Sequence, residues 1–240
     1  MSPRLSIVIP ALDEAANLAR LLPELASLCP GAEVLVVDGG SRDQTAETMA
    51  RQTGVRVIAS ARGRARQMNA GARAAEGDAL LFLHADTRLP AGAAEAIETA
   101  LAEPGVPGGR FDVRFDRERP IFRTIAWFMN VRSRATGICT GDQAIFVRRA
   151  EFEAVGGYPD IPLMEDIELS RRLKRRGGLR ALRLRVTTSA RKWEREGAWR
   201  TIGLMWTLRL LYWAGVGPAR LHRWYYGPPQ ESPKREPKES

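Results

Sequence analysis

Acidic residues follow three short apolar runs in the N-terminal part of the chain. They are Asp13 with Glu14, Asp38, and Asp86. Carboxylates gathered in one place repel one another and cost stability unless a cation or hydrogen-bond donors hold them. The spacing therefore predicts a site for a metal or a polar ligand. Taken alone, Asp13 and Ser41 are each also typical of helix caps.

The apolar runs predict the elements that position these acids. Compact β-branched runs predict buried strands at residues 5–9, 33–38, 55–59 and 79–83. Apolar residues at helical spacing predict helices between them, at residues 13–25, 43–51 and 64–75. This alternation predicts an α/β fold with a mostly parallel sheet covered by helices on both faces. Ligands bind such sheets outside the carboxyl ends of the strands, where the acids fall.

The second half of the chain is less regular. Strands are predicted at residues 109–115 and 144–147, with helices at 121–131, 149–154, 164–176 and 199–213. Residues 227–240 combine prolines with alternating charges and are predicted to be a disordered tail. The chain has no repeat and no linker. We therefore expect one domain at 1–226, with a nucleotide half at about 1–108 and an acceptor half at about 109–226.

Charge and cysteine content exclude several protein classes. The net charge of +9 comes mainly from arginine, which coding bias also produces, so we expect no nucleic-acid partner. Cys29 and Cys139 stand far apart without metal-ligand spacing, which fits a reducing cytoplasm better than a disulfide or a zinc site. No apolar stretch reaches the ~18 residues of a spanning helix. The expected location is the cytoplasm, with contact at the inner face of the plasma membrane.

Three segments carry a resemblance to a known family. They are residues 6–14 (SIVIPALDE), 36–45 (VVDGGSRDQT) and 164–166 (MED). In order and spacing they resemble the family-2, GT-A-fold glycosyltransferases, over residues 5 to about 195. The chain looks closest to a small bacterial subgroup found beside radical-enzyme and selenium-associated genes. Some relatives of that subgroup are labelled as glycosyltransferases of carotenoid acids.

The resemblance implies a nucleotide site and a metal site. The implied nucleotide-binding residues are Pro10, Ala11, Asp13, Glu14, Asp38, Ser41, Arg64, Asn69 and Ala85. Asp86 matches the last acid of the family's DxD-type motif and is expected to ligate Mg²⁺ or Mn²⁺ at the donor diphosphate, because hard cations take oxygen ligands. His84 stands where the family has the first acid. Arg66 is typical of either a phosphate contact or a solvated helix face.

Two further segments are expected near the sugar and the diphosphate. Gly141, Asp142 and Gln143 resemble the family's segment beneath the donor sugar, and a polar turn is the alternative. Arg191, Trp193 and Arg195 lie in a run that we expect to be a loop closing over the diphosphate, with a plain charged surface loop as the alternative.

The acids Glu165 and Asp166 open a predicted helix. Acids in the first turn and arginines in the last turn complement the helix dipole, which is one explanation of the pattern. The run also follows a rigid loop at residues 158–162, and the family pattern assigns the catalytic base to the second acid. We therefore predict Asp166 as the base, with Glu165 holding the loop or binding the acceptor.

The predicted activity is inverting transfer of a sugar from a nucleotide donor, UDP-linked by default, to an acceptor hydroxyl or carboxyl. The acceptor candidates include a lipid, a lipid-linked compound and a carotenoid. The rivals are a sugar nucleotidyltransferase, which would carry a glycine-rich basic loop after the first strand, and a basic nucleic-acid or membrane-surface binding module. A dinucleotide-binding oxidoreductase is disfavoured because no GxGxxG follows the first strand.

The last predicted helix suggests peripheral membrane contact. Its aromatic and aliphatic residues share one helical face: Trp199, Ile202, Trp206, Leu210 and Trp213. Residues 224–226 (WYY) follow, with Arg220 and Arg223 beside them, and such pairs of rings and cations suit the headgroup boundary. Packing of this helix on the protein's own core is the alternative, because Leu204, Leu208 and Leu211 make it apolar nearly all round.

Overall fold

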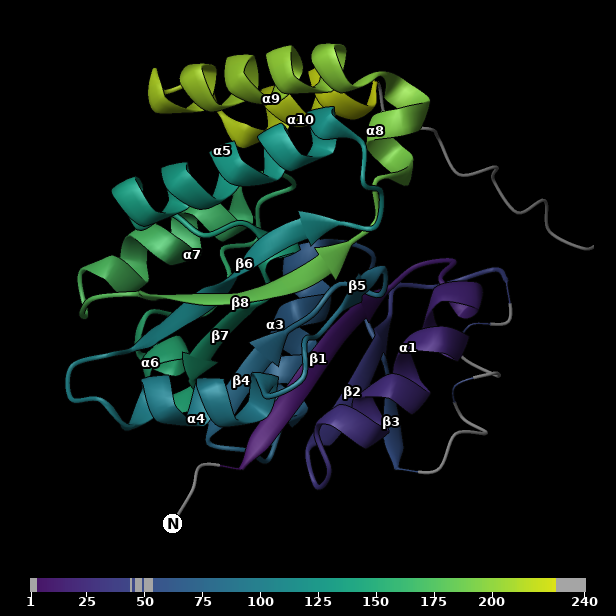
Figure 1. Cartoon of the computed structure of the whole chain (residues 1–240), viewed down its shortest axis with the longest axis vertical. Coiled ribbons are helices and arrows are strands. Elements are labelled where there is room, and N and C mark those ends of the chain that lie inside the picture. The colour runs from purple at the N-terminus through teal and green to yellow at the C-terminus, as the bar shows by residue number, and fades with distance from the viewer. Residues whose placement is uncertain (1–3, 44, 46–48, 50–53, 228–240) are drawn as a thin grey trace, which may run out of the picture.

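A computed structural model describes residues 4–43, 45, 49 and 54–227 (Figure 1). It has the predicted α/β fold, with helices on both faces of one sheet. The strands are β1 (Leu5–Ala11), β2 (Glu33–Asp38), β3 (Val55–Ala59), β4 (Ala79–Phe82), β5 (Thr87–Arg88), β6 (Gly108–Phe115), β7 (Ile145–Arg148) and β8 (Arg180–Thr188). The helices are α1 (Ala15–Leu28), α3 (Arg64–Ala74), α4 (Ala93–Ala102), α5 (Pro120–Thr136), the short 3-10 helix η1 (Gly141–Gln143), α6 (Arg149–Ala154), α7 (Glu165–Lys174), α8 (Arg191–Glu196), α9 (Ala198–Trp213) and α10 (Pro218–Tyr226).

The sheet has the strand order β3-β2-β1-β4-β7-β6-β8-β5. The first four strands are mutually parallel, and Ala11 at the end of β1 pairs with Asp38 at the end of β2. Strand β7 then runs antiparallel to β4 and β6, while β6 and β8 are parallel. The parallel strands bring the segments that follow β1, β2 and β4 to one edge of the sheet, as the sequence predicts.

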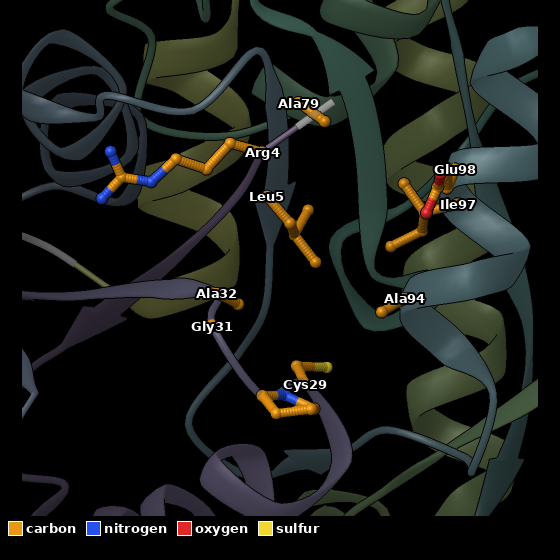
Figure 2. Close-up of a pocket in the computed structure, with 10 residues that line it drawn as sticks. Arg4, Leu5, Cys29, Gly31, Ala32, Ala79, Ala94, Ile97 and Glu98 are labelled. Atoms are coloured by element: carbon orange, nitrogen blue, oxygen red, sulfur yellow. The ribbon is translucent and has the colours of Figure 1, made fainter. Parts of the chain in front are cut away.

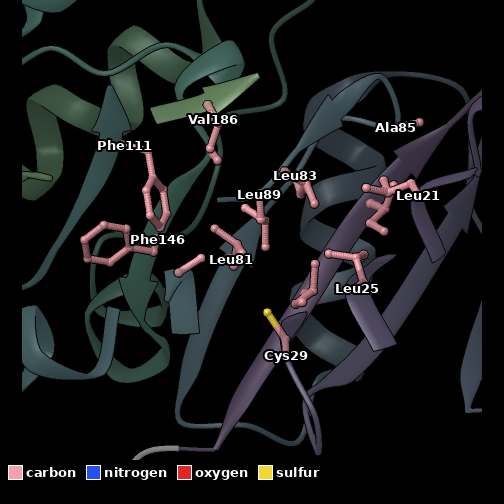
Figure 3. Close-up of a cluster of buried hydrophobic side chains, with 14 of the residues drawn as sticks. Leu21, Leu25, Cys29, Leu81, Leu83, Ala85, Leu89, Phe111, Phe146 and Val186 are labelled. Atoms are coloured by element: carbon pink, nitrogen blue, oxygen red, sulfur yellow. The ribbon is translucent and has the colours of Figure 1, made fainter. Parts of the chain in front are cut away.

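Alternating side chains along the strands fill a core on each face of the sheet. Ile7 and Leu81 pack on one side with α1, α4 and α5, whereas Val8 and Leu80 pack on the other with α3, α6 and α7. Figure 3 shows Leu81 of the first cluster with Leu25 of α1 and Phe146 of β7. Side chains alternate between faces with a period of two, so a strand buried on both sides reads as a continuous apolar run. This explains why β1, β2 and β4 can be predicted from the sequence.

The C-terminal helices form a separate layer over the second half of the sheet. Helix α9 packs beside α10 and α8, above α5 (Figure 1), and a small cluster around Met164, Leu208 and Leu221 joins this layer to the start of α7. Within the described residues, no helix is both long and apolar enough to cross a bilayer.

Several expected elements change in the structure. Residues 191–196, expected to be a loop, form helix α8, because the Trp193 ring packs on Phe115 of β6 and anchors the segment. Strands β5 and β8 and helices α4 and α10 are additions to the predicted elements. The helix expected at 43–51 falls largely outside the described residues, as does the tail at 228–240. One sheet runs through both expected halves, and the domain boundaries stay a prediction.

Candidate active site

The loops after β1 and β2 are tied together by side chains from both. Asp13 has a φ of 57°, its N–H donates to Ser41 Oγ at 2.9 Å, and its Oδ1 accepts the Arg42 N–H at 2.7 Å. Asp38 accepts the N–H groups of Ser41 at 3.1 Å and Gly40 at 3.3 Å, together with the Ser41 hydroxyl. Asp13, Asp38 and Ser41 thus build a fixed edge before any ligand binds.

The same two loops satisfy the free N–H groups at the start of α1. The Glu14 N–H donates to Thr45 Oγ1 at 3.1 Å, and the Ala15 N–H donates to Asp43 Oδ2 at 3.0 Å. Hydrogen bonds from the Thr45 hydroxyl and from N–H groups lower the pKa of Asp43. Asp13 therefore does not cap α1. Asp43 and Thr45 cap the helix instead. Sequence reasoning missed them because they lie about thirty residues beyond the start of α1 in the chain.

Gln67 of α3 fixes the ends of β1 and β2 from below. Its buried Nε2 donates to the carbonyl oxygens of Ala11 at 2.7 Å and Val37 at 2.9 Å. Gly39 makes room for this side chain, because a Cβ at that position would lie 2.9 Å from Gln67 Nε2. Pro10 and Ala11 are therefore held in place where their backbone borders the site.

Asp86 is exposed in the turn between β4 and β5, beside Glu14. Burial and the charge of Asp86 raise the pKa of Glu14, while a hydrogen bond from Asn17 and the charge of Arg191 oppose this rise. Among the described residues no group of three or more His, Cys, Asp or Glu side chains could hold a metal. Asp86 fits a hard cation that takes its other ligands from phosphate and water, as Mg²⁺ does in nucleotide sites.

The His84 ring contacts η1. Its Nδ1 lies 3.4 Å from Asp142 Oδ1, and its ring lies so close to Gly141 that a Cβ there would come within 2.5 Å of Nε2. Burial raises the pKa of Asp142, but the hydrogen bond and charge of His84, with the charges of Arg64 and Lys192, lower it to about 2. Ala85, between His84 and Asp86, is buried.

The two acids that begin α7 have different surroundings. Asp166 Oδ2 accepts the Gly141 N–H at 3.0 Å, and its Oδ1 accepts the Ile167 N–H at 2.7 Å. Glu165 is 4% exposed and lies 3.5 Å from Arg64 Nη1. Burial, followed by the charge of Asp166, raises the pKa of Glu165. The half-buried Asp166 thus meets η1 at the site, whereas Glu165 is enclosed beside Arg64.

Three cations that sequence reasoning missed interact electrostatically with Asp166 or Asp142. Burial and the charge of Arg209 lower the pKa of Arg132 to about 10, while Asp166 opposes this. Burial also lowers the pKa of Arg209, against the charges of Asp166 and Asp142. Burial lowers the pKa of Lys192, against the charges of Glu196 and Asp142, and its Nζ lies 4.3 Å from the centre of the Tyr225 ring. They come from α5, α9 and α8, so only the tertiary fold brings them together.

Some predicted site residues have structural partners instead. Asn69 exchanges two hydrogen bonds with the Tyr158 backbone, at 2.7 and 2.9 Å. Trp193 packs on Phe115, and Arg195 pairs with Glu196 at 3.2 Å. Asn69 and Trp193 are thus held by contacts within the protein, whereas the Arg195 side chain is 74% exposed, and the contacts predicted for all three stay predictions. Arg66 pairs with Asp160 at 2.8 Å, in the loop before α7.

Gln143 and Arg191 remain close to the site. The Gln143 side chain is fully buried, and its Oε1 accepts the N–H of Thr140 at 3.2 Å, which closes the first turn of η1. Arg191 is exposed at the first position of α8 and acts electrostatically on Glu14. Arg191 therefore lies on the same side of the sheet edge as Asp86.

Strain and unpaired polar atoms gather around this site. In the described part of the chain, the buried side-chain nitrogen and oxygen atoms without a hydrogen-bond partner belong to His84, Arg132 and Gln143. The non-glycine residues with positive φ there are Asp13, Ala144 and Met164, next to the loop after β1, to η1 and to Glu165. Both features are costly and concentrate at functional sites.

Two cavities flank the sheet. The one in Figure 2, of about 260 Å³, lies at the amino ends of β1 and β4, where Arg4, Cys29 and Glu98 line it, on the edge opposite the acids. The other, of about 460 Å³, lies between α8, α9 and α10, and Lys192, Arg200 and Tyr225 line it. Lys192 lines this second cavity and also interacts electrostatically with Asp142.

The α/β fold, with its mostly parallel sheet between layers of helices, is the GT-A fold. The profile of Glycosyl transferase family 2 matches residues 6–153, and the chain belongs to this family. No curated protein matches the chain significantly.

Solved structures share the fold at low sequence identity. The mannosyltransferase PcManGT from Pyrobaculum calidifontis, in complex with GDP-Man and Mn²⁺, superposes with a TM-score of 0.66 at 24% identity, over 94% of this chain and 70% of that one. TarS 1-349 of S. aureus superposes with a TM-score of 0.63 at 18% identity, over 78% of this chain and 60% of that one. TarS 1-349 in complex with UDP-GlcNAc gives a TM-score of 0.62 at 18% identity, over 78% and 58%. The chain thus spans about 60% of the length of TarS 1-349.

Proposed function

We propose that this protein is an inverting, metal-dependent glycosyltransferase that moves a sugar from a nucleotide donor to an acceptor hydroxyl or carboxyl. The observation that carries the proposal is the position of Asp166, whose Oδ2 lies 3.0 Å from the Gly141 N–H, beside the unpaired nitrogens of Arg132. An acid held against a turn that also bears Asp142 is well placed between a donor and an acceptor. The subgroup beside radical-enzyme and selenium-associated genes is our proposal for the nearest relatives.

The donor lies along the loops after β1, β2 and β4 in this proposal. Asp38 and the backbone at Pro10 and Ala11 hold the nucleoside, and Arg64 with Lys192 neutralises the diphosphate. A divalent cation at Asp86 supplies charge neutralisation of the diphosphate leaving group. Neighbouring structures with UDP-GlcNAc or with GDP-Man and Mn²⁺ support this class of donor and cofactor. UDP is the donor nucleotide that we expect by default.

Asp166 takes the proton in the transfer step. The acceptor hydroxyl gives its proton to the Asp166 carboxylate while its oxygen bonds to the anomeric carbon. The bond from that carbon to the donor phosphate oxygen breaks, and its electron pair leaves on the nucleoside diphosphate. One displacement inverts the anomeric configuration, and the cations Arg64 and Lys192 stabilise the departing charge.

The acceptor side favours a negatively charged acceptor. Arg132 and Arg209 are largely desolvated, and Asp166 and Asp142 stand close to them. A buried guanidinium is stabilised by a carboxylate or phosphate that takes its free hydrogen bonds. A carboxyl acceptor, such as that of a carotenoid acid or another lipid, supplies this group, and as a carboxylate it has no proton for Asp166 to remove.

A donor screen tests the proposal. UDP- and GDP-sugars, each with and without Mn²⁺, are mixed with the protein, and both thermal stabilisation and release of free sugar are measured. We expect stabilisation by one nucleotide class that depends on the metal and is lost in Asp86→Asn. Arg73→Glu, on the exposed side of α3, is the matched control and should behave as wild type. If no nucleotide sugar stabilises the protein, or if stabilisation is independent of the metal and of Asp86, the proposal is wrong.

A further inference from the structure

Large apolar side chains are exposed on three neighbouring helices. We call them the aromatic face: Trp127, Phe128 and Val131 on α5, Trp199, Trp206, Leu210 and Trp213 on α9, and Trp224 on α10. Trp213 is 87% exposed and Trp199 78%. Soluble monomers rarely expose large contiguous apolar surface, so such surface indicates a binding partner.

The outer side of α9 carries most of the aromatic face. Residues three and four positions apart share one side of a helix, which places Trp199, Trp206 and Trp213 together. The opposite side is packed, because Thr201 and Leu208 are 3% and 1% exposed. Packing on the core therefore explains only the inner side. Ile202, predicted to share the outer face, is half-buried against the main core instead.

Helices α5 and α9 lie side by side. Arg132 of α5 and Arg209 of α9 act on each other electrostatically, and Figure 1 shows the two helices stacked at one end of the molecule with α10 beside them. The exposed residues of all three helices therefore belong to one end of the protein rather than to scattered spots.

The charge of these helices is of one sign. No aspartate or glutamate occurs in α5, α9 or α10. Their exposed arginines are Arg123, Arg134, Arg200, Arg220 and Arg223, of which Arg134 pairs with Asp112 of β6 at 2.6 Å. The Arg220 guanidinium lies 5.2 Å from the centre of the Trp224 ring, which pairs a cation with an exposed aromatic. The three helices thus carry apolar side chains and cations without an acid of their own, which is complementary to a surface that is apolar inside and anionic at its border.

We infer that the aromatic face docks on an anionic lipid bilayer. Tryptophan rings settle at the headgroup boundary, and each arginine near an anionic surface adds attraction. A second copy of the chain fits less well, because two such faces would bring arginines together without acids to pair them. An acidic membrane offers both the apolar layer and the counter-charge.

The larger cavity lies directly behind this face. Arg200 and Trp224 line it and also belong to the helices of the face, while Lys192 lines it from the side of Asp142. A docked protein would therefore hold this cavity at the membrane surface. This position suits the lipid acceptor that the proposed function includes, although docking itself stands without it.

Tryptophan fluorescence measures docking directly, because the emission of exposed tryptophans shifts when their rings enter a bilayer. Five of the six tryptophans lie in the aromatic face, and Trp193 is the sixth. The full-length protein is titrated with vesicles of phosphatidylcholine alone and of equal parts phosphatidylcholine and phosphatidylglycerol, and flotation of the same mixtures is measured. We expect a blue shift and flotation with the anionic vesicles, weakening as salt is raised, because screening reduces the attraction.

Two variants and one control sharpen the test. The double variant Trp206→Ser with Trp213→Ser removes exposed rings and should weaken binding at least about tenfold. Arg220→Glu with Arg223→Glu should weaken it at least about fivefold for each charge. Arg73→Glu on α3 has the same charge change outside the face and should bind as wild type. Thermal unfolding of each variant checks that the fold is kept.

Three results would overturn the inference. The first is no fluorescence shift and no flotation with anionic vesicles. The second is equal binding to pure phosphatidylcholine, which would remove the arginines from the account. The third is a stable dimer in sedimentation that the tryptophan variants abolish, because a second copy would then cover the face. Donor binding is measured separately, so failure of docking leaves the transferase proposal to its own test.

Discussion

Replacing Asp166 with asparagine isolates its charge from its shape. The carboxylate accepts two N–H groups, from Gly141 at 3.0 Å and from Ile167 at 2.7 Å. Asparagine has one acceptor oxygen, so one of these N–H groups loses its partner, at a cost of about 1–3 kcal/mol. For a chain of this size each kcal/mol lowers the Tm by roughly 2–4 °C. Separately from this loss of stability, loss of the general base should lower turnover by roughly 10²–10⁴-fold.

The assay separates these two effects. Turnover of donor with a hydroxyl acceptor is measured together with donor affinity by calorimetry and Tm by thermal unfolding. We expect the turnover loss with a donor Kd within about twofold of wild type, because Asp166 acts on the acceptor side. Glu165→Gln is the matched variant one position away. With a carboxylate acceptor, which carries no proton to remove, the turnover loss should shrink.

Three results would refute this assignment. If Asp166→Asn keeps wild-type turnover while Glu165→Gln is inactive, the roles of the two acids are reversed. If both variants stay active, the base lies elsewhere, and the acids serve the helix dipole of α7 alone. A fall in donor affinity that accounts for the whole turnover loss would place Asp166 on the donor side instead.

Other residues give independent predictions. Asp86→Asn should lose metal-dependent donor binding with an unchanged Tm, because its side chain is exposed; unchanged Mn²⁺ dependence in a titration would remove Asp86 from the metal site. Asp38→Ala should weaken nucleoside diphosphate binding about 10–100-fold in calorimetry, since hydrogen bonds to charged groups are worth about 1.5–3 kcal/mol; equal affinity would contradict the nucleoside contact. Burial raises the pKa of Glu165 above 4.5, so the folded protein holds that proton more tightly than the unfolded chain. The stability contributed by Glu165 is therefore lost as pH rises through the folded pKa, and the Tm of Glu165→Gln relative to wild type should rise from pH 4 to pH 8; a falling difference would show the opposite shift. Burial raises the pKa of Cys29 and Cys139 to about 11, so a thiol reagent should label both only on unfolding, and fast labelling of the folded protein would contradict their burial.

Strands β1, β2 and β4 of the first half were predictable because they are buried on both faces. Strands β1, β2 and β4 lie in the middle of the sheet and read as continuous apolar runs. Strand β8 does not. Its arginines at 180, 183 and 185 face solvent and only its last residues are buried, so its partner β6 defines it and the local sequence does not. Helix α8 likewise depends on a tertiary contact of Trp193.

The acids that we propose for the site stand out in the sequence, whereas most of the cations near them do not. Asp38, Asp86 and Asp166 stand next to apolar runs or at a helix start, which the sequence displays. Lys192 and Arg132 lie in helices without a motif of their own, and only the packing of α8 and α5 brings them near the acids. Asn69 was predicted to contact the nucleotide, and its side chain is hydrogen-bonded to the Tyr158 backbone, so the nucleotide contact stays a prediction. Sequence alone does not distinguish a ligand contact from a framework contact.

A crystal structure with a nucleoside diphosphate and Mn²⁺ tests the central claim most directly. Crystals are soaked with UDP or GDP together with the metal, and anomalous scattering locates the manganese. The account predicts a manganese peak about 2.0–2.2 Å from an Asp86 carboxylate oxygen, the distance expected for a small hard cation. The nucleoside should lie between the loop after β1 and Asp38. Nucleotide and metal bound at the cavity near Arg4 and Glu98, or metal bound away from Asp86, would contradict it.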